Sequence, residues 1–299
     1  MENFILILLC LLLGYSVQKF HIFSEDAPKT LNQFVIYVSL PAMILLQVPK
    51  LSFSSELFIP IVIAWVVMTL TAVLTLFLSR FFSFSREVTG SLMLVSILTN
   101  SSFLGIPIIN AYMGETALPY IMIYDQFGTF LAFALYGTFI VSFYSHKSEV
   151  NVKIIATKII TFPPFLALLI ALFLMDVKFD ESITKVLAIL ANTIVPVAVV
   201  AVGLQLQLRL TQDELKPFSV SLLVKLVAAP LIAIALTKLF GWDNQASHVA
   251  ILEAGMSPMI TAGAMASMAG LAPKLSSAIV GYGILFSFLT TNLLYRFIL

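Results

Sequence analysis

Three ionisable side chains lie deep inside apolar stretches of the sequence: Asp125, Lys225 and Glu253. A charge is costly in an apolar environment, and within a membrane such residues mark ion or substrate pathways by default. Lys225, in SVSLLVKLVAAPL, needs a carboxylate partner, a wet cavity or a bound anion. Glu253 and Asp125 could share a coupling cation, either Na⁺ or a proton, with the candidate sodium site at Glu253. The alternative is that all three are structural groups.

Two apolar stretches contain glycine, proline and small polar residues: TNSSFLGIPIINAYMG from Thr99 and EAGMSPMITAGAMASMAG from Glu253. A broken helix exposes backbone N–H groups that favour anions and C=O groups that favour cations. Matched breaks of this kind indicate a transporter binding site, whereas the simpler interpretation is two proline kinks packed against small residues. The candidate substrate-binding residues are Asn100, Ser101, Ser102, Gly105, Pro107, Gly255, Ser257, Pro258 and Lys225.

The composition sets the class of protein that must position these residues. Of 299 residues, 60% are hydrophobic and 10% are charged, whereas soluble domains carry about 45–50% apolar and about 25% charged residues. This indicates a polytopic membrane protein in contact with lipids. The net charge of +1 gives no reason to expect nucleic-acid binding, and the lone cysteine, Cys10, cannot form an internal disulfide.

Ten segments are long and apolar enough to be transmembrane helices, which need about 20 such residues. The loops between them are short, and no soluble domain fits. The N-terminal segment lacks a basic n-region and a cleavage site, so we expect it to be retained. The predicted segments are 3–20, 30–48, 56–79, 88–111, 118–144, 154–175, 184–206, 215–239, 246–270 and 275–298.

Weak internal matches divide the chain into two halves, 1–150 and 151–299. Pro41 and Pro196 lie 155 residues apart in the second and seventh segments, and Glu56 and Glu214 begin the third and eighth at an offset of 158. Because five helices is an odd number, the second half must enter the membrane in the opposite orientation. Such an inverted repeat is a common plan of secondary transporters.

Lysine and arginine counts predict the orientation, because these residues are enriched on the cytoplasmic side. With the N-terminus outside, ten of them flank the inner ends of the segments and five the outer ends, with Lys225 left out. We therefore predict a multi-pass protein of a prokaryotic plasma membrane with both termini outside. No enzyme motif, cofactor motif or P-loop is present, so any transport would be secondary rather than ATP-driven.

Four stretches resemble the auxin efflux carrier family, which includes bacterial malate and malonate permeases and the plant PIN carriers. They are LNQFVIYVSLPA (31–42), NSSFLGIPIINAYMG (100–114), YDQFG (124–128) and EAGMSPMITAGAMA (253–266). The resemblance covers the whole chain, without the large central loop of the long plant carriers. Each stretch is short, and the combination is what makes the likeness specific.

This resemblance implies an all-α membrane fold with a 5+5 inverted repeat, similar to sodium/proton antiporters and bile acid symporters. Helices 4 and 9 would cross at two prolines, Pro107 or a neighbour and Pro258. Segments 1, 2, 6 and 7 would form a scaffold domain, and segments 3–5 and 8–10 a transport domain that moves like an elevator. A homodimer through the scaffold is expected, and Asn100 matches a substrate-contacting asparagine in the family.

The resemblance leaves the coupling ion and the function open. Glu253 departs from the plant pattern and is similar to a sodium-binding glutamate of the sodium–bile acid symporters, so sodium, proton and uncoupled transport all remain. The first hypothesis is a secondary transporter of small organic anions, such as malate- or auxin-like carboxylates. The second is a sodium-driven symporter of larger amphipathic anions. The third is a membrane sensor or scaffold that binds a ligand without moving it.

Overall fold

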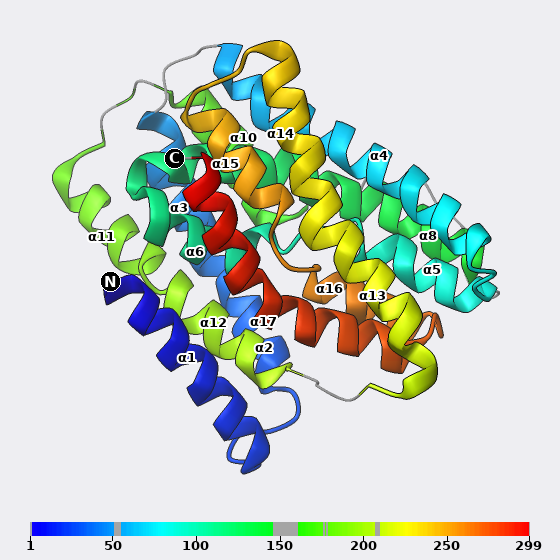
Figure 1. The fold of residues 1–299 in the computed structure, drawn as a ribbon. Helices are drawn as coiled ribbons and strands as arrows, with labels where there is room; N and C mark the ends of the chain where they lie inside the picture. The colour runs from blue at the N-terminus through cyan, green and yellow to red at the C-terminus, as the bar shows by residue number, and fades with distance from the viewer. Residues whose placement is uncertain are drawn as a thin grey trace.

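The computed structural model describes residues 2–50, 55–145, 161–175, 177, 179–206 and 210–298. These residues form helices joined by short turns, with no strand beyond one isolated bridge. Within them, six helical runs are long and apolar enough to cross a membrane: Ala27–Gln47, Ser55–Phe81, Glu115–Tyr144, Glu181–Leu204, Gln212–Phe240 and Pro273–Ile298. Ile5–Lys19 and Pro163–Phe173 are shorter apolar helices. Figure 1 shows the whole arrangement.

The first half begins with α1 (Glu2–Lys19), and the second run joins α2 (Ala27–Phe34), the π-turn η1 (Val35–Ser39) and α3 (Leu40–Gln47). Then follow α4 (Phe58–Phe81), α5 (Arg86–Val95), η4 (Ser101–Gly105), α6 (Ile106–Met113), α7 (Leu118–Ile123), η6 (Tyr124–Phe130), η7 (Phe133–Gly137) and α8 (Thr138–Tyr144). Short 3-10 turns cover Val48–Lys50, Ser55–Leu57 and Glu115–Ala117.

The second half contains α10 (Pro163–Phe173), α11 (Glu181–Ala191), α12 (Ile194–Leu204), α13 (Leu215–Leu223), η9 (Val224–Ala228), α14 (Ala229–Phe240), α15 (Gln245–Ala254), α16 (Ile260–Met268) and α17 (Pro273–Ile298). A 3-10 turn at Gln212–Glu214 precedes α13. The start of the predicted segment 154–175 lies outside the described residues. The predicted segments 88–111 and 246–270 are both broken into half-helices. The all-helical membrane class is thus confirmed, while the ten-segment inverted repeat stays a prediction.

Three π-turns directly precede a proline in the first turn of the next helix. These prolines are Pro41 in α3, Pro107 in α6 and Pro230 in α14. Proline lacks an N–H group, and its ring clashes with the carbonyl four residues earlier. In each case that carbonyl belongs to the widened turn, η1, η4 or η9, so the wider turn accommodates the ring while the helix continues. Two of these turns carry predicted site residues.

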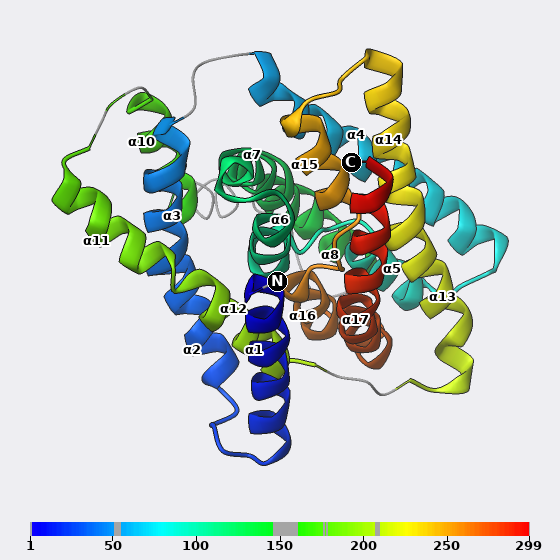
Figure 2. The ribbon, with the colours of Figure 1, turned by 60° about the vertical axis from the view of Figure 1, so that its left-hand side comes forward.

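The helices pack into two groups (Figure 2). In the first, α1 lies along α12, and α10 and α11 pack against α3. Gly14 and Gly203 face each other across the α1–α12 contact, where a Cβ atom on either would collide with the opposite backbone. In the second group, α4, α14 and α15 pack together, as do α5, α16 and α17. A hydrogen bond of 2.7 Å between Ser39 Oγ and Thr193 Oγ1 links the second and seventh predicted segments.

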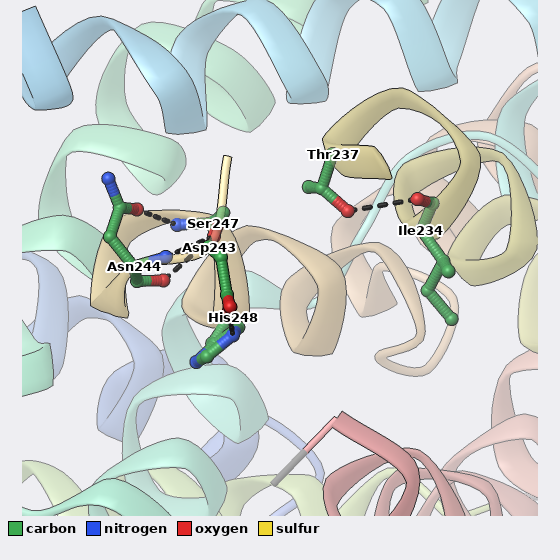
Figure 3. Close-up of polar contacts among 6 residues, drawn as sticks. All are labelled: Ile234, Thr237, Asp243, Asn244, Ser247 and His248. Carbon is green, nitrogen blue, oxygen red and sulfur yellow. Dashed lines mark hydrogen bonds and ion pairs between the residues drawn. The ribbon is translucent and has the colours of Figure 1, made fainter. Parts of the chain in front are cut away.

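A well-capped turn sets where α15 begins (Figure 3). Helix α14 ends at Gly241, which has a positive φ of 66° that glycine adopts without strain. Asn244 Oδ1 then accepts a hydrogen bond of 3.0 Å from the Ser247 backbone N–H, and Ser247 Oγ accepts one of 3.1 Å from the Asn244 N–H. His248 Nε2 lies 3.0 Å from Asp243 Oδ1 in the same turn. With its start fixed, the ten-residue helix brings Glu253 and Ala254 to the middle of the molecule.

A candidate binding site at the crossing of two broken segments

The two broken segments meet through their backbones. The Asn100 N–H donates to Ser257 O and the Met259 N–H donates to Leu98 O, each at 3.0 Å. This forms an antiparallel bridge between Thr99 and Pro258. The bonds satisfy backbone groups that an interrupted helix would otherwise leave unpaired inside the molecule. The sequence therefore indicated the two breaks correctly, and the structure adds that the breaks pair with each other.

The bridge corrects one detail of the expected crossing. Pro258 lies in it, as the family resemblance implies, but its partner in the other segment is Thr99. Pro107 instead occupies the first turn of α6, eight positions further along the chain. A proline is tolerated there because the widened turn η4, which runs directly into α6, accommodates its ring. The crossing thus lies at the extended residues before η4.

Asp125, in η6, is a fully engaged carboxylate. Its Oδ1 accepts hydrogen bonds from Ser101 Oγ and from Ser102 Oγ, the latter at 2.6 Å, and its Oδ2 accepts one of 2.5 Å from Gln126 Nε2. The side chain is 2% exposed. Its sequence position near a helix end could have placed it at the membrane interface, whereas the structure buries it. It lies at the N-terminal end of η4, where the helix dipole favours an anion.

Glu253 is a buried carboxylate of the opposite kind. It has no exposed surface, and neither carboxylate oxygen has a hydrogen-bond partner in the described part of the chain. A Cβ atom on Gly105 would collide with this carboxylate, so the glycine allows the close approach. The charges of Asp125 and Lys225 both act on Glu253. An unpaired charge in such a place is costly, and a bound cation or proton would relieve that cost.

Lys225 reaches the crossing from η9 and is 1% exposed. Its Nζ donates to Thr99 Oγ1 at 2.6 Å and to the backbone carbonyl of Ala254 at 3.0 Å. One acceptor therefore comes from each broken segment. The ammonium group of Lys225, in the middle of an apolar segment, is therefore paired with neutral oxygens at the crossing.

One amide group and one hydroxyl group at the crossing have no hydrogen-bond partner in the described part of the chain. These are Asn100 Nδ2 and Ser257 Oγ, and both are buried. Gly255 ends α15, and Pro258 packs so closely on Gly283 that a Cβ atom there would come within about 2.5 Å of its ring. Most of the predicted substrate residues thus gather at or beside the crossing, with Pro107 set back in α6.

No cluster of three or more His, Cys, Asp or Glu residues suited to a metal ion occurs in the described ranges. A sodium ion at Glu253 would have to draw its remaining oxygen ligands from carbonyl, hydroxyl and amide groups. Oxygen ligands of this kind are the ones that hard cations prefer. Along the bridge, the side chains that carry such oxygens are Thr99, Asn100 and Ser257.

Sequence reasoning missed a polar cavity of about 880 Å³ beside the crossing. Its inner wall includes Ile260 and Thr261, which directly follow the bridge residues, and Thr261 Oγ1 has no partner among the described residues. The side-chain amides of four residues also line the cavity: Gln18, Asn32, Gln33 and Gln205. Because they come from three different predicted segments, no local motif indicated them. Further lining residues are His21, Glu25 and Lys29.

A second cavity, of about 440 Å³, lies between α4, α5 and α8. Its walls are mostly apolar, with Trp65, Met93 and Tyr136 among them and Arg80 as the charged residue. Neither Asp125 nor Glu253 lines either cavity. The polar cavity is the one whose lining includes residues next to the bridge, Ile260 and Thr261.

The comparisons with known proteins agree with this architecture. A family of proteins described as membrane transport protein matches residues 1–295. The chain belongs to this family. An uncharacterized transporter of Methanocaldococcus jannaschii is 27% identical over 272 residues, covering 87% of both chains. An uncharacterized transporter of Methanothermobacter thermautotrophicus is 26% identical over 268 residues, covering 89% of this chain and 87% of the relative.

This membership confirms the predicted resemblance to auxin efflux carriers, and it makes the protein a multi-pass membrane transporter rather than an enzyme. The names of the two relatives give neither a substrate nor a coupling ion.

Proposed function

We propose that this transporter carries small organic anions with carboxylate groups, such as malate- or auxin-like acids, by a secondary mechanism. The observation that supports this most is the crossing itself. It joins the donor Asn100 Nδ2 and the carboxylate of Glu253, both without partners in the described residues, beside a polar cavity. A donor and a negative charge left open together suit a carboxylate and its accompanying cation.

The substrate carboxylate would bind at the donors around the bridge. Asn100 Nδ2 can donate one hydrogen bond and Ser257 Oγ another. The N-terminal end of α16, with Thr261 in its first turn, offers the positive end of a helix dipole and faces the polar cavity. A small anion entering that cavity would therefore meet donors before it meets Glu253.

The charges at the crossing favour a coupling cation. Asp125 and Glu253 carry two negative charges when ionised, and Lys225 carries one positive charge, which leaves a net charge of −1. Adding a carboxylate substrate raises this excess in a buried site. One Na⁺ or one proton at Glu253 would remove part of it, and this gives a physical reason for the ion and the anion to travel together.

The two groups of helices suggest how access alternates. The scaffold would consist of segments 1, 2, 6 and 7, and the transport domain, segments 3–5 and 8–10, would carry the crossing past it like an elevator. The polar cavity supports this division, since α1, α2 and α12 line one side and α16 and α17 the other. A homodimer through the scaffold, and a prokaryotic plasma membrane with both termini outside, complete the proposal.

Uptake into proteoliposomes tests this function. Purified protein would be reconstituted and offered labelled mono- and dicarboxylates under imposed proton, sodium or voltage gradients. We expect saturable uptake of at least one carboxylate, accelerated by one of the cation gradients. Absence of uptake for every acid under all three gradients would remove the proposed substrate class.

The substitution Asn100→Ala tests the binding site, with Asn110→Ala in α6 as the matched control. Asn100→Ala should abolish carboxylate-dependent thermal stabilisation while leaving the melting temperature of the unliganded protein nearly unchanged, because Nδ2 has no partner to lose among the described residues. Asn110→Ala should leave substrate binding intact. Equal affinity in wild type and Asn100→Ala would exclude Asn100 from the site.

A sodium-coupled symporter of larger amphipathic anions is the second candidate. The volume of about 880 Å³ and the apolar lining residues Phe23, Ile36 and Val280 favour it, because they could accommodate an apolar body behind a carboxylate. Sodium-dependent stabilisation that is lost in Glu253→Gln, together with competition by bile-acid-like amphiphiles, would support this candidate. Equal stabilities in sodium and choline buffers would count against it.

A further inference from the structure

The end of a half-helix inside a membrane protein is a natural cation position. The last four carbonyls of a helix have no intrahelical donor, and they carry the negative end of the helix dipole. Transporters use such carbonyl ends to coordinate their coupling ions. In this chain α15 ends at Ala254, fully buried, and the group that its carbonyl contacts is the ammonium of Lys225.

The choice of partners separates Lys225 from an ordinary buried ion pair. A buried lysine normally pairs directly with a carboxylate, yet the Glu253 oxygens accept no hydrogen bond from any described residue. Nζ instead contacts a hydroxyl oxygen, Thr99 Oγ1, and a helix-end carbonyl oxygen, Ala254 O. Neutral oxygens of this kind, together with a carboxylate whose charge acts on the ammonium, resemble the oxygen environment of a bound metal cation.

We propose that Lys225 is a resident cation, whose ammonium fills a position at the end of α15 that a free alkali cation would otherwise bind. In this role it ties the two broken segments together, because one of its acceptors comes from each. It is a positioning residue that holds Thr99 and Ala254, and through them Asn100 and Glu253. The inference deepens the proposed function by leaving Glu253, rather than the end of α15, as the place where a transported cation exchanges.

The position would become an empty cation site if the ammonium were removed. Lys225→Ala leaves the two neutral oxygens and the nearby Glu253 carboxylate facing the space that the side chain vacates. A small alkylammonium ion, or Na⁺, could then enter and restore the missing contacts. Tetramethylammonium could not, because it has no N–H group to donate and its four methyl groups keep the oxygens away from its charged nitrogen.

The test compares melting temperatures of purified wild type and Lys225→Ala in choline, sodium, methylammonium and tetramethylammonium chloride at equal ionic strength. We expect Lys225→Ala to melt well below wild type in choline and tetramethylammonium, and to regain several degrees in methylammonium or sodium. Wild type should lack the methylammonium increment. A Lys225→Ala protein that is insensitive to the cation, or stabilised equally by tetramethylammonium, would overturn the proposal.

A second pair of variants covers the case in which Lys225→Ala cannot be purified in any salt. Thr99→Ser keeps the hydroxyl acceptor and Thr99→Val removes it, while Lys225 stays in place. We expect Thr99→Ser to melt near wild type and Thr99→Val several degrees lower, and equal melting temperatures would overturn the proposal. These readouts need no transported substrate, so cation rescue without carboxylate uptake would refute the proposed function and leave this inference standing.

Discussion

The Asp125 side and the Glu253 side of the crossing contain the same chemical group in opposite circumstances. Both carboxyl groups are at most 2% exposed. Asp125 accepts hydrogen bonds from Ser101, Ser102 and Gln126, whereas Glu253 accepts none from the described residues. Burial alone therefore does not indicate which carboxylate is functional. The hydrogen bonds make Asp125 part of the framework of the fold, and we expect Glu253 to be the carboxylate that meets a ligand.

Their positions on helices strengthen this contrast. Asp125 lies at the N-terminal end of η4, where an anion is favoured, and Glu253 is the second-last residue of α15, where an anion is disfavoured. The framework carboxylate is thus stabilised twice, by its donors and by a helix dipole. Glu253 has neither source of stabilisation, so a bound cation or proton should stabilise Glu253 more than Asp125.

The largest effect should follow from Glu253→Gln. Losing the negative charge should reduce cation-driven uptake by about 5- to 150-fold, the range of a coupling free energy of 1–3 kcal/mol. The melting temperature should not fall, because the carboxylate has no described hydrogen-bond partner to lose and its unpaired charge is itself costly. Uptake driven by each ion gradient, measured beside Glu115→Gln in an exposed loop, checks this. Full cation-driven uptake in Glu253→Gln would remove the contrast between the two carboxylates.

Asp125→Asn should instead destabilise the fold, by about 2–3 kcal/mol. An amide nitrogen in place of one carboxylate oxygen would face a donor, and hydrogen bonds to charged groups contribute about 1.5–3 kcal/mol each. Thermal unfolding in detergent measures the loss, with Gln126→Glu as a variant that perturbs the same cluster from its other side. An unchanged melting temperature would show that Asp125 is not part of the framework.

Gly105→Ala should have an intermediate effect, costing about 1–3 kcal/mol because an added methyl group must displace its neighbours. The group displaced is the Glu253 carboxylate, so the ion dependence of uptake should change as well. Gly137→Ala is the matched control, since its Cβ would lie in ordinary contact at 3.6 Å from Met265 Sδ. Equal behaviour of the two alanine variants would contradict the close packing of Gly105 on Glu253.

The smallest effect is expected far from the crossing, at the start of α15. Asn244→Ala removes the cap acceptor of the Ser247 N–H, at a cost of about 1 kcal/mol. Its melting temperature should fall slightly while the cation selectivity of uptake stays that of wild type. A changed selectivity would mean that the position of Glu253 depends on how α15 begins.

The sequence predicted the parts of the site that depend on residue type. Glycine, proline and polar residues within apolar stretches indicated both breaks, and burial of Lys225 and Glu253 follows from their apolar surroundings. The burial of Asp125, near a predicted helix end, did not follow from the sequence. The hydrogen-bond partners could not be predicted, because they lie on different segments of the chain. Asp125 bonds to Ser101 across 24 residues, and Lys225 bonds to Thr99 across 126.

The same limit explains the errors of detail in the fold. Prolines mark both segments, so Pro107 or a neighbour was expected at the crossing, but a widened turn such as η4 lets a helix continue through a proline. Likewise, the π-turns η1, η4 and η9 follow from prolines that the sequence displays, yet nothing local says whether a helix will widen or break there. Whether the helix widens or breaks at such a proline depends on the residues packed around it in the folded protein.

The short backbone bridge between Thr99 and Pro258 also has a mechanical consequence. Its two hydrogen bonds, from Asn100 to Ser257 and from Met259 to Leu98, run in opposite directions between the two broken segments. Neither segment can slide along its own axis without breaking both bonds at once. Any displacement of one segment must therefore drag the other along. Since these bonds use main-chain atoms, side-chain replacement at the crossing leaves this link between the two segments in place.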